Sequence, residues 1–562
     1  MEETRRDSRV VVGEEEENDD QEEQEQGRTL LPEKHAGKWP PSIKYIMGNE
    51  ACERFSFYGL KAILALYLKN FLHLSEDTAT TVIHTFIFGA YGSSVLGGYI
   101  ADSFLGKFRT ILYISFVYCL GSITLACTAL PGATGDPPHW WGAALGLLLV
   151  AIGTGGIKAS VSSFVGDQFP PGPGQEALLT TVFSIFYFCI NMGSLSSTLI
   201  TPLLREYTTY SIAFGVPAVL LLFATVIFWL GKPTYRIVPP GPNVINVTFG
   251  VVGRAIAEKY RSFRRRYSVM GDEEQAVGRK RFLDYAYPIY PQQTIQDVRD
   301  VLQVFKVFLP LPIFWSLYDQ HSSRWIFQAE QMDRYLGFDF EIQPDQVPTL
   351  NPLLILLLIP IFNKGVYPGL EKIGLKLKPL ARMSIGMFLA SLSFVVSGLV
   401  ELAIEKKMDV FIAWQLPQYF LLCCGEILVS ITGLEFAYSQ APKTMKSVVM
   451  AGWLLTTAIG NAIVAGVAEV KIFESQAWEF FFYAGLMIVF LGLFLLVAWT
   501  YTYVSVAEEE GASPRAEGVV TRHQEEEARP DCSNSAQTED REDPLLVPAR
   551  RKKKQGGGYQ EL

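Results

Sequence analysis

The sequence lacks the features on which most enzymes and disulfide-stabilised secreted domains depend. Its 7 cysteines are odd in number and have no paired spacing, so they indicate neither a disulfide framework nor a metal site. No nucleophile–base pair, metal-ligand cluster or phosphate-binding loop lies on a polar segment, so we expect neither an enzyme nor a cofactor, and no nucleic-acid partner. Because segment 1–40 is polar and acidic, we expect no cleavable signal peptide there.

Charge is missing from several long apolar runs. Hydrophobic residues make up 49% of the chain, and the mean hydropathy is +0.20. No Asp, Glu, Lys or Arg occurs in Ile111–Leu130, Ser211–Gly231 or Phe480–Trp499. Each run reaches the roughly 20 residues that an α-helix needs to cross a bilayer. The chain is therefore predicted to be a multi-pass membrane protein in contact with lipid.

The apolar segments form six spans, a basic linker and six more spans, which predicts an all-α membrane protein of two six-helix bundles with a cavity between them. The expected parts are a disordered acidic tail (1–40), an N-terminal bundle (41–231), a linker (232–300), a C-terminal bundle (301–505) and a disordered tail (506–562). The expected spans are 43–71, 79–101, 109–130, 140–160, 177–203, 210–231, 301–328, 346–363, 381–403, 411–439, 446–469 and 478–504.

Lysine and arginine are concentrated in the connections that follow even-numbered spans, with the exception of the connection after span four. Positive charge near membrane spans stays on the cytosolic side. Both termini and the linker are therefore expected in the cytosol. The net charge of −9 does not oppose this orientation, because the acidic tails dominate it.

The first span carries more charge than a lipid-facing helix tolerates. Glu50, Arg54, Tyr58 and Lys61 recur at helical spacing and share one face, and Glu53 lies about 60° from it. Each charge at the bilayer centre costs ~2.5–3.5 kcal/mol on insertion scales. These residues must therefore line a watery cavity or pair with one another, and we interpret them as a proton and carboxylate site. The alternative is a set of salt bridges that only joins helices.

Other spans of the first half carry isolated polar side chains. His84 in the second span is a candidate proton acceptor, expected to lie beside the carboxylates of the first span. Lys158 in the fourth span needs a carboxylate, for which we expect Glu53 or Glu50. Asn191 in the fifth span offers a donor and an acceptor to an amide. Packing and helix–helix hydrogen bonds are the alternatives for His84 and Asn191.

The connection between the second and third spans, Gly97–Ile111, is a candidate gate or hinge. Its glycines permit a tight turn and close helix approach. Asp102 can accept from helix N-terminal amides or from a cation of a neighbouring span, and Lys107 anchors the cytosolic side.

The second half carries a lone carboxylate, Glu426, in the tenth span. Facing a cationic first bundle, it predicts a bipolar site for a substrate with one negative and one positive end. Trp315 and Asp319 share a face of the seventh span. Trp453 in the eleventh span is a candidate cavity wall, with aromatic packing as the alternative.

Several of these segments resemble, in order, the signatures of the proton-coupled oligopeptide transporters of the major facilitator superfamily. Glu50–Phe55 resembles the family's ExxERF motif, Gly98–Ile111 its signature between the second and third helices, and Phe186–Leu195 its fifth-helix signature. Later stretches are similar to the animal intestinal and renal branch, and the resemblance covers about residues 40–505. These stretches are Phe314-Trp315, Gln343–Gln346, Gln418–Glu426, Gly433–Pro442 and Ala451–Trp453.

The resemblance implies a symporter that imports di- and tripeptides with protons by rocking of two bundles. Arg54 and Lys61, with Lys158 nearby, would hold the peptide carboxylate. Glu426 with Asn351 would hold its ammonium, and Asn191 a backbone amide. The remaining implied roles are side-chain pockets (Tyr58, Tyr91, Trp315, Trp453), proton coupling (Glu50, Glu53, Arg54, His84) and gating (Asp102, Lys107, Asp319).

The chain departs from the family pattern at three places. Only about ten residues, Glu401–Val410, link the ninth and tenth spans, where the animal relatives carry a large extracellular domain. Gln303 and Asn363 stand where those relatives have an Arg–Asp pair, so inherited gating detail does not transfer. Lys61 stands where relatives often have arginine, and a lysine does not bind a carboxylate through two parallel hydrogen bonds.

Two other functions fit the same pattern. One is transport of histidine, nitrate or another small solute, and the other is a nutrient-sensing receptor or scaffold that signals through its tails. We expect a monomer in the plasma membrane, with the endolysosomal membrane as the alternative, since Gln26–Leu31 and Arg541–Leu546 loosely resemble dileucine sorting signals.

Overall fold

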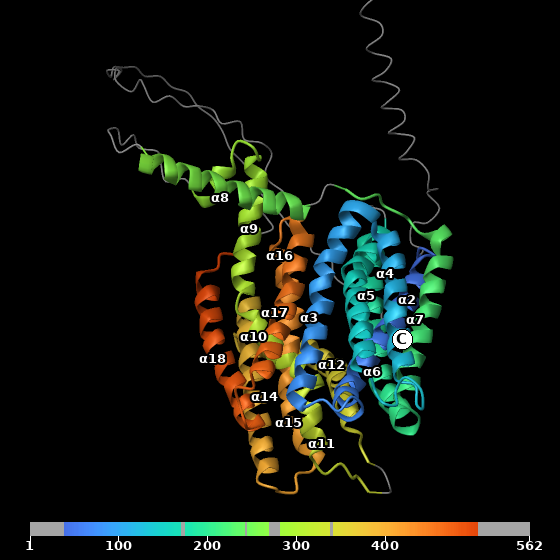
Figure 1. Cartoon of the computed structure of the whole chain (residues 1–562). Coiled ribbons are helices and arrows are strands. Elements are labelled where there is room, and N and C mark those ends of the chain that lie inside the picture. Colours follow the sequence, from blue (N-terminus) through green and yellow to red (C-terminus); the bar gives the residue numbers. More distant parts are fainter. Residues whose placement is uncertain (1–38, 170–174, 242–243, 269–280, 338–340, 504–562) are drawn as a thin grey trace, which may run out of the picture. The chain divides into compact units, whose positions relative to one another are not determined.

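The computed structural model describes residues 39–169, 175–241, 244–268, 281–337 and 341–503. Every described residue lies within the unit Met1–Val504. The predicted tails and sorting signals therefore lie outside the described residues. Helices dominate the described part, which forms only isolated β-bridges and no strand (Figure 1).

The N-terminal half forms six long helices around one hydrophobic core. At the second helix, the Ser75 side chain accepts a hydrogen bond from the Thr78 backbone N–H and caps the first turn. Farther along, a Cβ on Gly97 would lie 2.3 Å from the carbonyl oxygen of Gly156, so only glycine allows this approach. The elements are α2 (Ile43–Leu66) with η1 (Tyr67–Phe71), α3 (Glu76–Ile100) with η2 (Ala101–Leu105), α4 (Lys107–Thr128), α5 (Trp140–Asp167), α6 (Gln175–Tyr207) and α7 (Tyr210–Leu230).

The segment between the halves contains η3 (Lys232–Thr234), α8 (Val244–Ser268) and η4 (Phe282–Ala286). In Figure 1, α8 runs across the direction of the long helices. Its Val251 and Ala255 share a hydrophobic core with Leu283 and Ala286. This segment marks one end of the helical unit, which we call the linker end.

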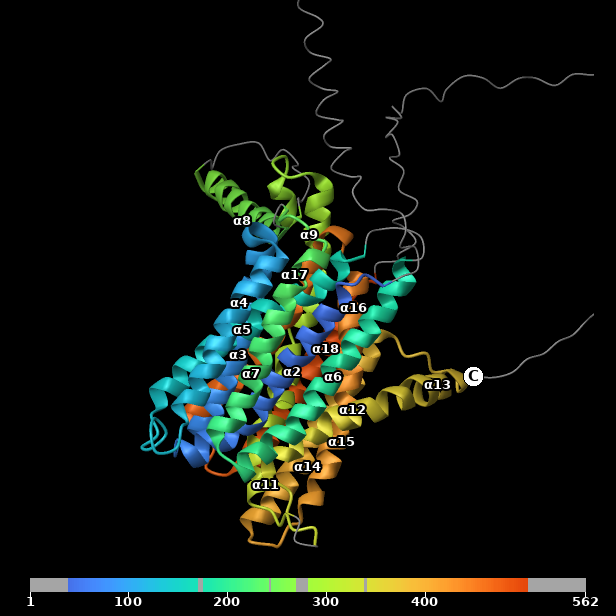
Figure 2. The same cartoon turned by 90° about the vertical axis from the view of Figure 1, so that its right-hand side faces the viewer.

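The C-terminal half forms the second hydrophobic core. It contains α9 (Gln292–Phe308), α10 (Leu311–Tyr318), η5 (Asp319–Ser322), α11 (Arg324–Glu330), η6 (Pro344–Thr349), α12 (Leu350–Ile361), η7 (Phe362–Val366), α13 (Tyr367–Lys372), α14 (Pro379–Glu405), η8 (Ile412–Gln415), α15 (Leu416–Glu426), η9 (Ile427–Ile431), α16 (Thr432–Gln440), η10 (Lys443–Met445), α17 (Lys446–Val470) and α18 (Gln476–Thr500). Figure 2, a view from another side, shows α13 continuing from α12 and projecting away from the long helices.

The seventh span differs from its prediction. The span was expected over 301–328 but begins at Gln292, and it bends by 46° between Phe308 and Leu311, in line with the kinks expected where proline interrupts a long span. Pro310 lies at the break and Pro312 follows it. Proline removes a backbone donor and restricts the residue before it, which interrupts the helix here.

The number of spans agrees with the prediction once polar helices are included. In the described residues, nine helices are long and apolar enough to cross a membrane, and the bent pair makes ten. The other two of the expected twelve are α2 and α3, with 24 and 25 residues. Four charged residues of α2 (Glu50, Glu53, Arg54, Lys61) make that helix too polar to be recognised as a membrane span from its hydropathy. Hydropathy alone therefore misses a helix that carries many candidate functional residues.

Candidate functional site

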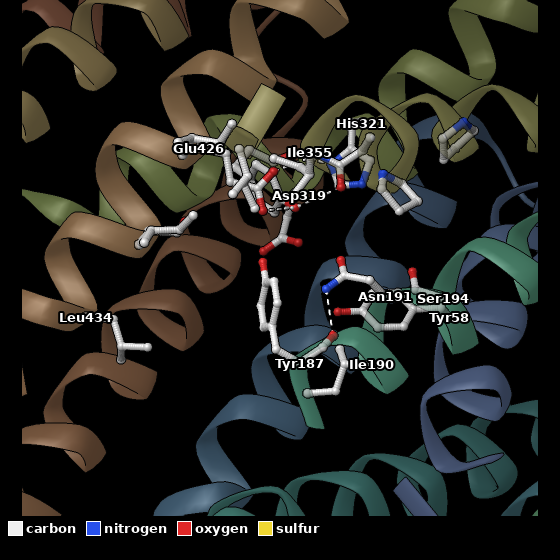
Figure 3. A pocket seen from close by; sticks show the side chains of 18 of the residues that line it. Tyr58, Tyr187, Ile190, Asn191, Ser194, Asp319, His321, Ile355, Glu426 and Leu434 are labelled. Atoms are coloured by element: carbon white, nitrogen blue, oxygen red, sulfur yellow. Dashed lines mark hydrogen bonds between the residues drawn. The ribbon is translucent and has the colours of Figure 1, made fainter. Parts of the chain in front are cut away.

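A cavity of about 620 Å³ lies between the two halves and takes residues from both (Figure 3). Its N-terminal wall comes from α2, α3 and α6, and its C-terminal wall from α10 with η5, from η6, and from α12 to α16. Eight of the predicted site residues line it: Tyr58, Lys61, Tyr91, Asn191, Trp315, Asp319, Asn351 and Glu426. The remaining predicted residues lie behind the wall or elsewhere.

The charged face of α2 is split between the cavity and the protein interior. Tyr58 and Lys61 line the cavity, whereas Glu50, Glu53 and Arg54 do not. Arg54 lies between the two carboxylates, with Nε 2.9 Å from Glu50 Oε1 and Nη2 2.6 Å from Glu53 Oε2. The Thr154 hydroxyl of α5 donates to the other Glu53 oxygen at 2.8 Å. In this state the guanidinium is ion-paired with two buried carboxylates.

Lys61 is bound across the cavity by the other half of the molecule. Its Nζ lies 2.8 Å from Asp319 Oδ1. The second Asp319 oxygen accepts from Asn461 Nδ2 at 2.7 Å. Lysine and aspartate are 8% and 2% exposed, so removing one partner strands a buried charge, which costs about 3–5 kcal/mol.

His84 continues this chain of hydrogen bonds instead of joining the carboxylates of α2. Its Nδ1 is 2.7 Å from Asn461 Oδ1, and its Nε2 is 2.8 Å from Ser323 Oγ. Asn461 Nδ2 faces two acceptors, Asp319 and the Thr457 carbonyl, so its Oδ1 must face His84. Neutral His84 therefore carries its proton on Nδ1. The expectation that His84 lies beside Glu50 or Glu53 is wrong, because Asn461 and Ser323 hold both ring nitrogens.

Glu426 presents a carboxylate to the cavity without a cation. Oε1 accepts from the Tyr318 hydroxyl at 2.9 Å and Oε2 from Asn351 Nδ2 at 2.7 Å. No lysine, arginine or histidine nitrogen of the described residues lies within 4.0 Å of it. Tyr318 was not predicted. Its place beside Asp319 in a span rich in aromatic residues was the available signal.

Asn191 and Trp315 use part of their hydrogen-bonding capacity inside the protein. Asn191 Nδ2 donates to the Tyr187 carbonyl of its own helix at 2.8 Å, as the dashed line in Figure 3 shows, so its side-chain oxygen remains for a ligand. Trp315 Nε1 donates to Thr456 at 3.0 Å. Trp453 packs edge-on against Trp315 with ring centroids 6.0 Å apart and does not line the cavity.

Lys158 also differs from its prediction. Its Nζ lies 3.6 Å from the ring centroid of Tyr91, and in the described part of the chain no carboxylate oxygen comes within 4.0 Å of it. The expected pair with Glu53 or Glu50 is wrong, because Arg54 occupies both carboxylates and the Tyr91 ring holds the ammonium by a cation–π contact.

The candidate gate residues lie near the linker end, apart from the central cavity. Lys107 pairs with Asp167 at 2.7 Å. Asp102 and Lys107 line a separate cavity of about 300 Å³ with Pro239 and Pro240. Partial burial raises the pKa of Asp102, an effect that Lys107 counteracts. The third candidate, Asp319, lies instead at the centre of the molecule.

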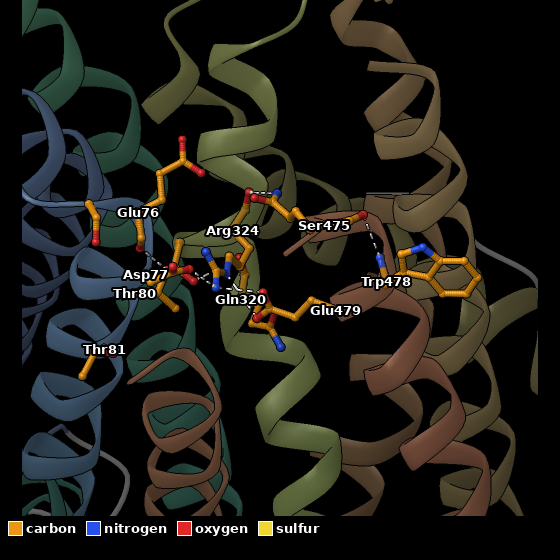
Figure 4. A network of polar contacts seen from close by, with 12 residues as sticks. Glu76, Asp77, Thr80, Thr81, Gln320, Arg324, Ser475, Trp478 and Glu479 are labelled. Carbon is orange, nitrogen blue, oxygen red and sulfur yellow. Dashed lines mark hydrogen bonds and ion pairs between the residues drawn. The ribbon is translucent and has the colours of Figure 1, made fainter. Parts of the chain in front are cut away.

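Ion pairs join the halves at the end opposite the linker. Arg324 of α11 contacts Asp77 of α3 at 2.9 Å and Glu479 of α18 at 2.7 Å (Figure 4). Lys69 pairs with Glu330 at 2.8 Å, and Arg205 with Asp345 at 2.9 Å. These pairs connect the ends of spans. The sequence predicted where those ends lie, but not that they form ion pairs. The molecule is therefore closed at this end.

The cavity extends the other way, toward the linker end. Its lining includes Asn363, Tyr367, Arg382 and Glu435, at the ends of α12 to α16 that point to the linker. Gln303, the other departure from the family pattern, accepts from Lys306 on α9. Among the residues that the structure describes, no group of three or more His, Cys, Asp and Glu side chains is arranged to hold a metal ion.

Known proteins resemble the chain over most of its length. A family model described as POT family matches residues 108–471. Solute carrier family 15 member 1 of Rattus norvegicus is 31% identical, over 84% of this chain and 94% of that protein. Solute carrier family 15 member 2 of Homo sapiens is 32% identical, over 85% and 91%. The rat alignment runs over 682 positions, so the relative contains long stretches with no counterpart here.

Solved structures resemble the fold as well. A crystal structure titled as an auto-inhibited POT family peptide transporter superposes with a TM-score of 0.72 and 34% identity, covering 83% of this chain and 98% of that one. A POT family transporter crystallised in meso gives the same TM-score at 36% identity, covering 83% and 99%.

Proposed function

Since the chain belongs to the POT family of membrane transporters, we propose that it is a proton-coupled symporter that imports di- and tripeptides by alternating access. The predicted family and the all-helical major facilitator fold are confirmed. The relatives are named as peptide transporters and solute carriers, not as enzymes. A secondary transporter of this kind needs no cofactor besides the protons that drive it.

One observation supports a peptide as the substrate above the others. Two opposite charges, Lys61 and Glu426, line one cavity from different halves of the molecule. Among the described residues, Glu426 has hydrogen-bond donors but no cation within 4.0 Å, so a peptide ammonium would supply its missing charge. The peptide carboxylate would take Lys61 from Asp319, and Asn191 would meet the backbone amide.

The proton enters this scheme at Asp319. Protonating the carboxylate removes the charge that holds Lys61, so the ammonium becomes free for the peptide. His84 is linked to Asp319 through Asn461. When His84 gains a proton on Nε2, that nitrogen donates to Ser323. The positive charge of the imidazolium then weakens the electrostatic attraction between Asp319 and Lys61. Glu50, Glu53 and Arg54 form a second ionisable group behind the wall, which we propose takes part in coupling.

The structure represents the state that is open toward the linker end. We propose that the linker and both termini are cytosolic, which makes this the inward-facing state of a monomer in the plasma membrane. Rocking of the halves would break the ion pairs of Arg324, Lys69 and Arg205 and close the linker end, with Asp102 and Lys107 among the residues of that second gate. A fluorescent tag on the full chain separates plasma-membrane from endolysosomal residence.

Uptake of a labelled dipeptide tests the proposal. The purified full chain in proteoliposomes is assayed with an inward proton gradient, with and without a protonophore, at pH 6 and pH 8. We expect accumulation that is larger at pH 6 and is abolished by the protonophore. Uptake indifferent to both would refute coupling. Unlabelled histidine or nitrate that competes better than dipeptides would assign the alternative solute, and a chain that binds dipeptide without moving it would favour the receptor.

A further inference from the structure

Two π turns shape the part of the central cavity that lies nearest the linker. η7 follows α12 and η9 follows α15, and residues in or just beyond them line the cavity. Phe362 of η7 and Ile427 of η9 belong to one small hydrophobic cluster, so the two turns support each other. We call this part of the cavity the vestibule, and its polar lining is Asn363, Tyr367, Arg382, Thr432 and Glu435.

The π turn η9 brings a second carboxylate onto the cavity wall. Nine residues of unbroken α-helix between Glu426 and Glu435 would rotate the side chain by about 900° and place it on the opposite face. A π turn accommodates roughly one additional residue, which returns Glu435 by about 100°. Both carboxylates accordingly line the same cavity, roughly 12 Å apart along the helix axis.

Only two lysine or arginine side chains occur among the described residues that line this cavity, Lys61 and Arg382. Lys61 is engaged by Asp319 at 2.8 Å. Arg382 has no carboxylate oxygen within 4.0 Å in the described part of the chain. In the state open to the linker end, the cation available to a substrate carboxylate is therefore Arg382.

Arg382 is held in place for such a role. Its Nε donates to the Leu377 carbonyl at 3.2 Å, and its guanidinium carbon lies 4.2 Å from the ring centroid of Tyr367. One edge and one face of the group are thus fixed, and the remaining N–H groups are left to bind an anion. Glu435, on the wall formed by α16, likewise has no cation within 4.0 Å among the described residues.

We propose that the vestibule is a second peptide-binding station, which the peptide occupies after it leaves the central site and before it is released at the linker end. When Asp319 loses its proton and recovers Lys61, the peptide carboxylate passes to Arg382. The ammonium stays on Glu426 or moves to Glu435. The station rests on the proposed function, because it binds the same zwitterionic peptides as the central site.

Transport from each face of the membrane tests the station. The full chain is reconstituted in proteoliposomes, and dipeptide KM is measured separately from the linker face and from the opposite face. We expect Arg382→Gln to raise the KM at the linker face five- to tenfold and to leave the KM at the opposite face within twofold. Arg382→Lys keeps the charge and should restore most of the linker-face affinity. Glu435→Gln should raise the linker-face KM two- to fivefold.

Lys378→Gln is the matched control. Lys378 precedes Arg382 by four residues at the same helix end, is exposed, and does not line the cavity, so this variant should keep both KM values. An unchanged linker-face KM in Arg382→Gln overturns the station, as does an equal rise at both faces or an equal effect of Lys378→Gln. If the wild-type protein transports no dipeptide, the proposed function fails first. If it transports and Arg382→Gln is silent, only the station fails.

Discussion

Single residues of this chain are tied to partners that local sequence does not reveal. The charges of α2 were predicted to pair or to face water, and they do both: Arg54 is paired behind the wall, while Lys61 lines the cavity. The spacing of four residues made the Glu50–Arg54 pair predictable. Lys61 and Asp319 are 258 positions apart, so their contact required the arrangement of the two halves.

Removing the carboxylate that holds Lys61 should uncouple transport from protons. Asp319→Asn keeps the size of the side chain but leaves Lys61 without its counter-charge. We expect the ratio of dipeptide uptake at pH 6 to uptake at pH 8 to fall close to one, and driven accumulation to drop about tenfold or more, since a buried pair is worth several kcal/mol. A variant that keeps the wild-type pH ratio would show that Asp319 is not the switch.

Neutralising Glu426 should weaken binding of the peptide ammonium. Glu426→Gln can still accept from Tyr318 but offers no charge, and a hydrogen bond to a charged group contributes about 1.5–3 kcal/mol. The dipeptide KM should rise about 10- to 100-fold. Glu405→Gln is the control, because this exposed carboxylate on α14 contacts Ser475 outside the cavity. Equal KM values for the two variants would contradict the assignment.

At the level of whole helices, apolar runs and proline predicted where spans lie but not how they are interrupted. Most predicted spans coincide with observed helices within a few residues, since about 20 apolar residues are needed to cross a bilayer. A kink at proline, as at Pro310, was expected, but the π turns η7 and η9 were missed. A π turn has no reliable sequence signal, because it depends on how neighbouring helices pack. The place of Glu435 on the cavity wall was missed for that reason.

Close contact between α3 and α5 should depend on glycines, with Gly97 among them. A Cβ on Gly97 would lie 2.3 Å from the Gly156 carbonyl oxygen, and backbone cannot move aside cheaply. We expect Gly97→Ala to destabilise the protein by about 1–3 kcal/mol, which thermal unfolding of the detergent-solubilised chain measures. Gly92→Ala lies in the same helix with no atom within 4 Å of its new Cβ and should be close to neutral. Equal shifts in Tm would refute the contact.

Across the whole molecule, ion pairs join the halves at the end opposite the linker, beside the apolar contact of Ile326 and Phe327 with the N-terminal core. The predicted topology placed the ends of α3, α6, α11 and η6 at one level, but it could not show that Asp77, Arg324 and Glu479 converge there. Each sequence motif lies within one half, whereas the closure is formed by contacts between residues of different halves. The sequence therefore predicted the central site better than the closure.

Breaking that closure should shift the molecule toward the opposite opening. Arg324→Gln removes two ion pairs at once and leaves Asp77 and Glu479 unpartnered. We expect Thr81→Cys, introduced in α3 in a Cys127→Ser background, to react several-fold faster with an impermeant thiol reagent applied at that face. Arg334→Gln is the control, since its pair with Glu341 at 2.7 Å lies within one half. Acceleration by the control as well would indicate general loosening.

In the proposed cycle, the pair of Lys61 and Asp319 would also limit the uncoupled movement of peptide and protons. One ammonium serves two anions, so the loaded carrier cannot hold its peptide and its ionised aspartate at the same time. An empty carrier that takes up a proton at Asp319 leaves Lys61 without its counter-ion, which penalises proton leakage, whereas the empty carrier without a proton keeps the bridge and can return. A peptide that binds while Asp319 is ionised must displace this buried carboxylate from Lys61, so transport of peptide without a proton is disfavoured. In this scheme, competition for one lysine couples the movement of protons to the movement of peptide, and no further coupling element is needed.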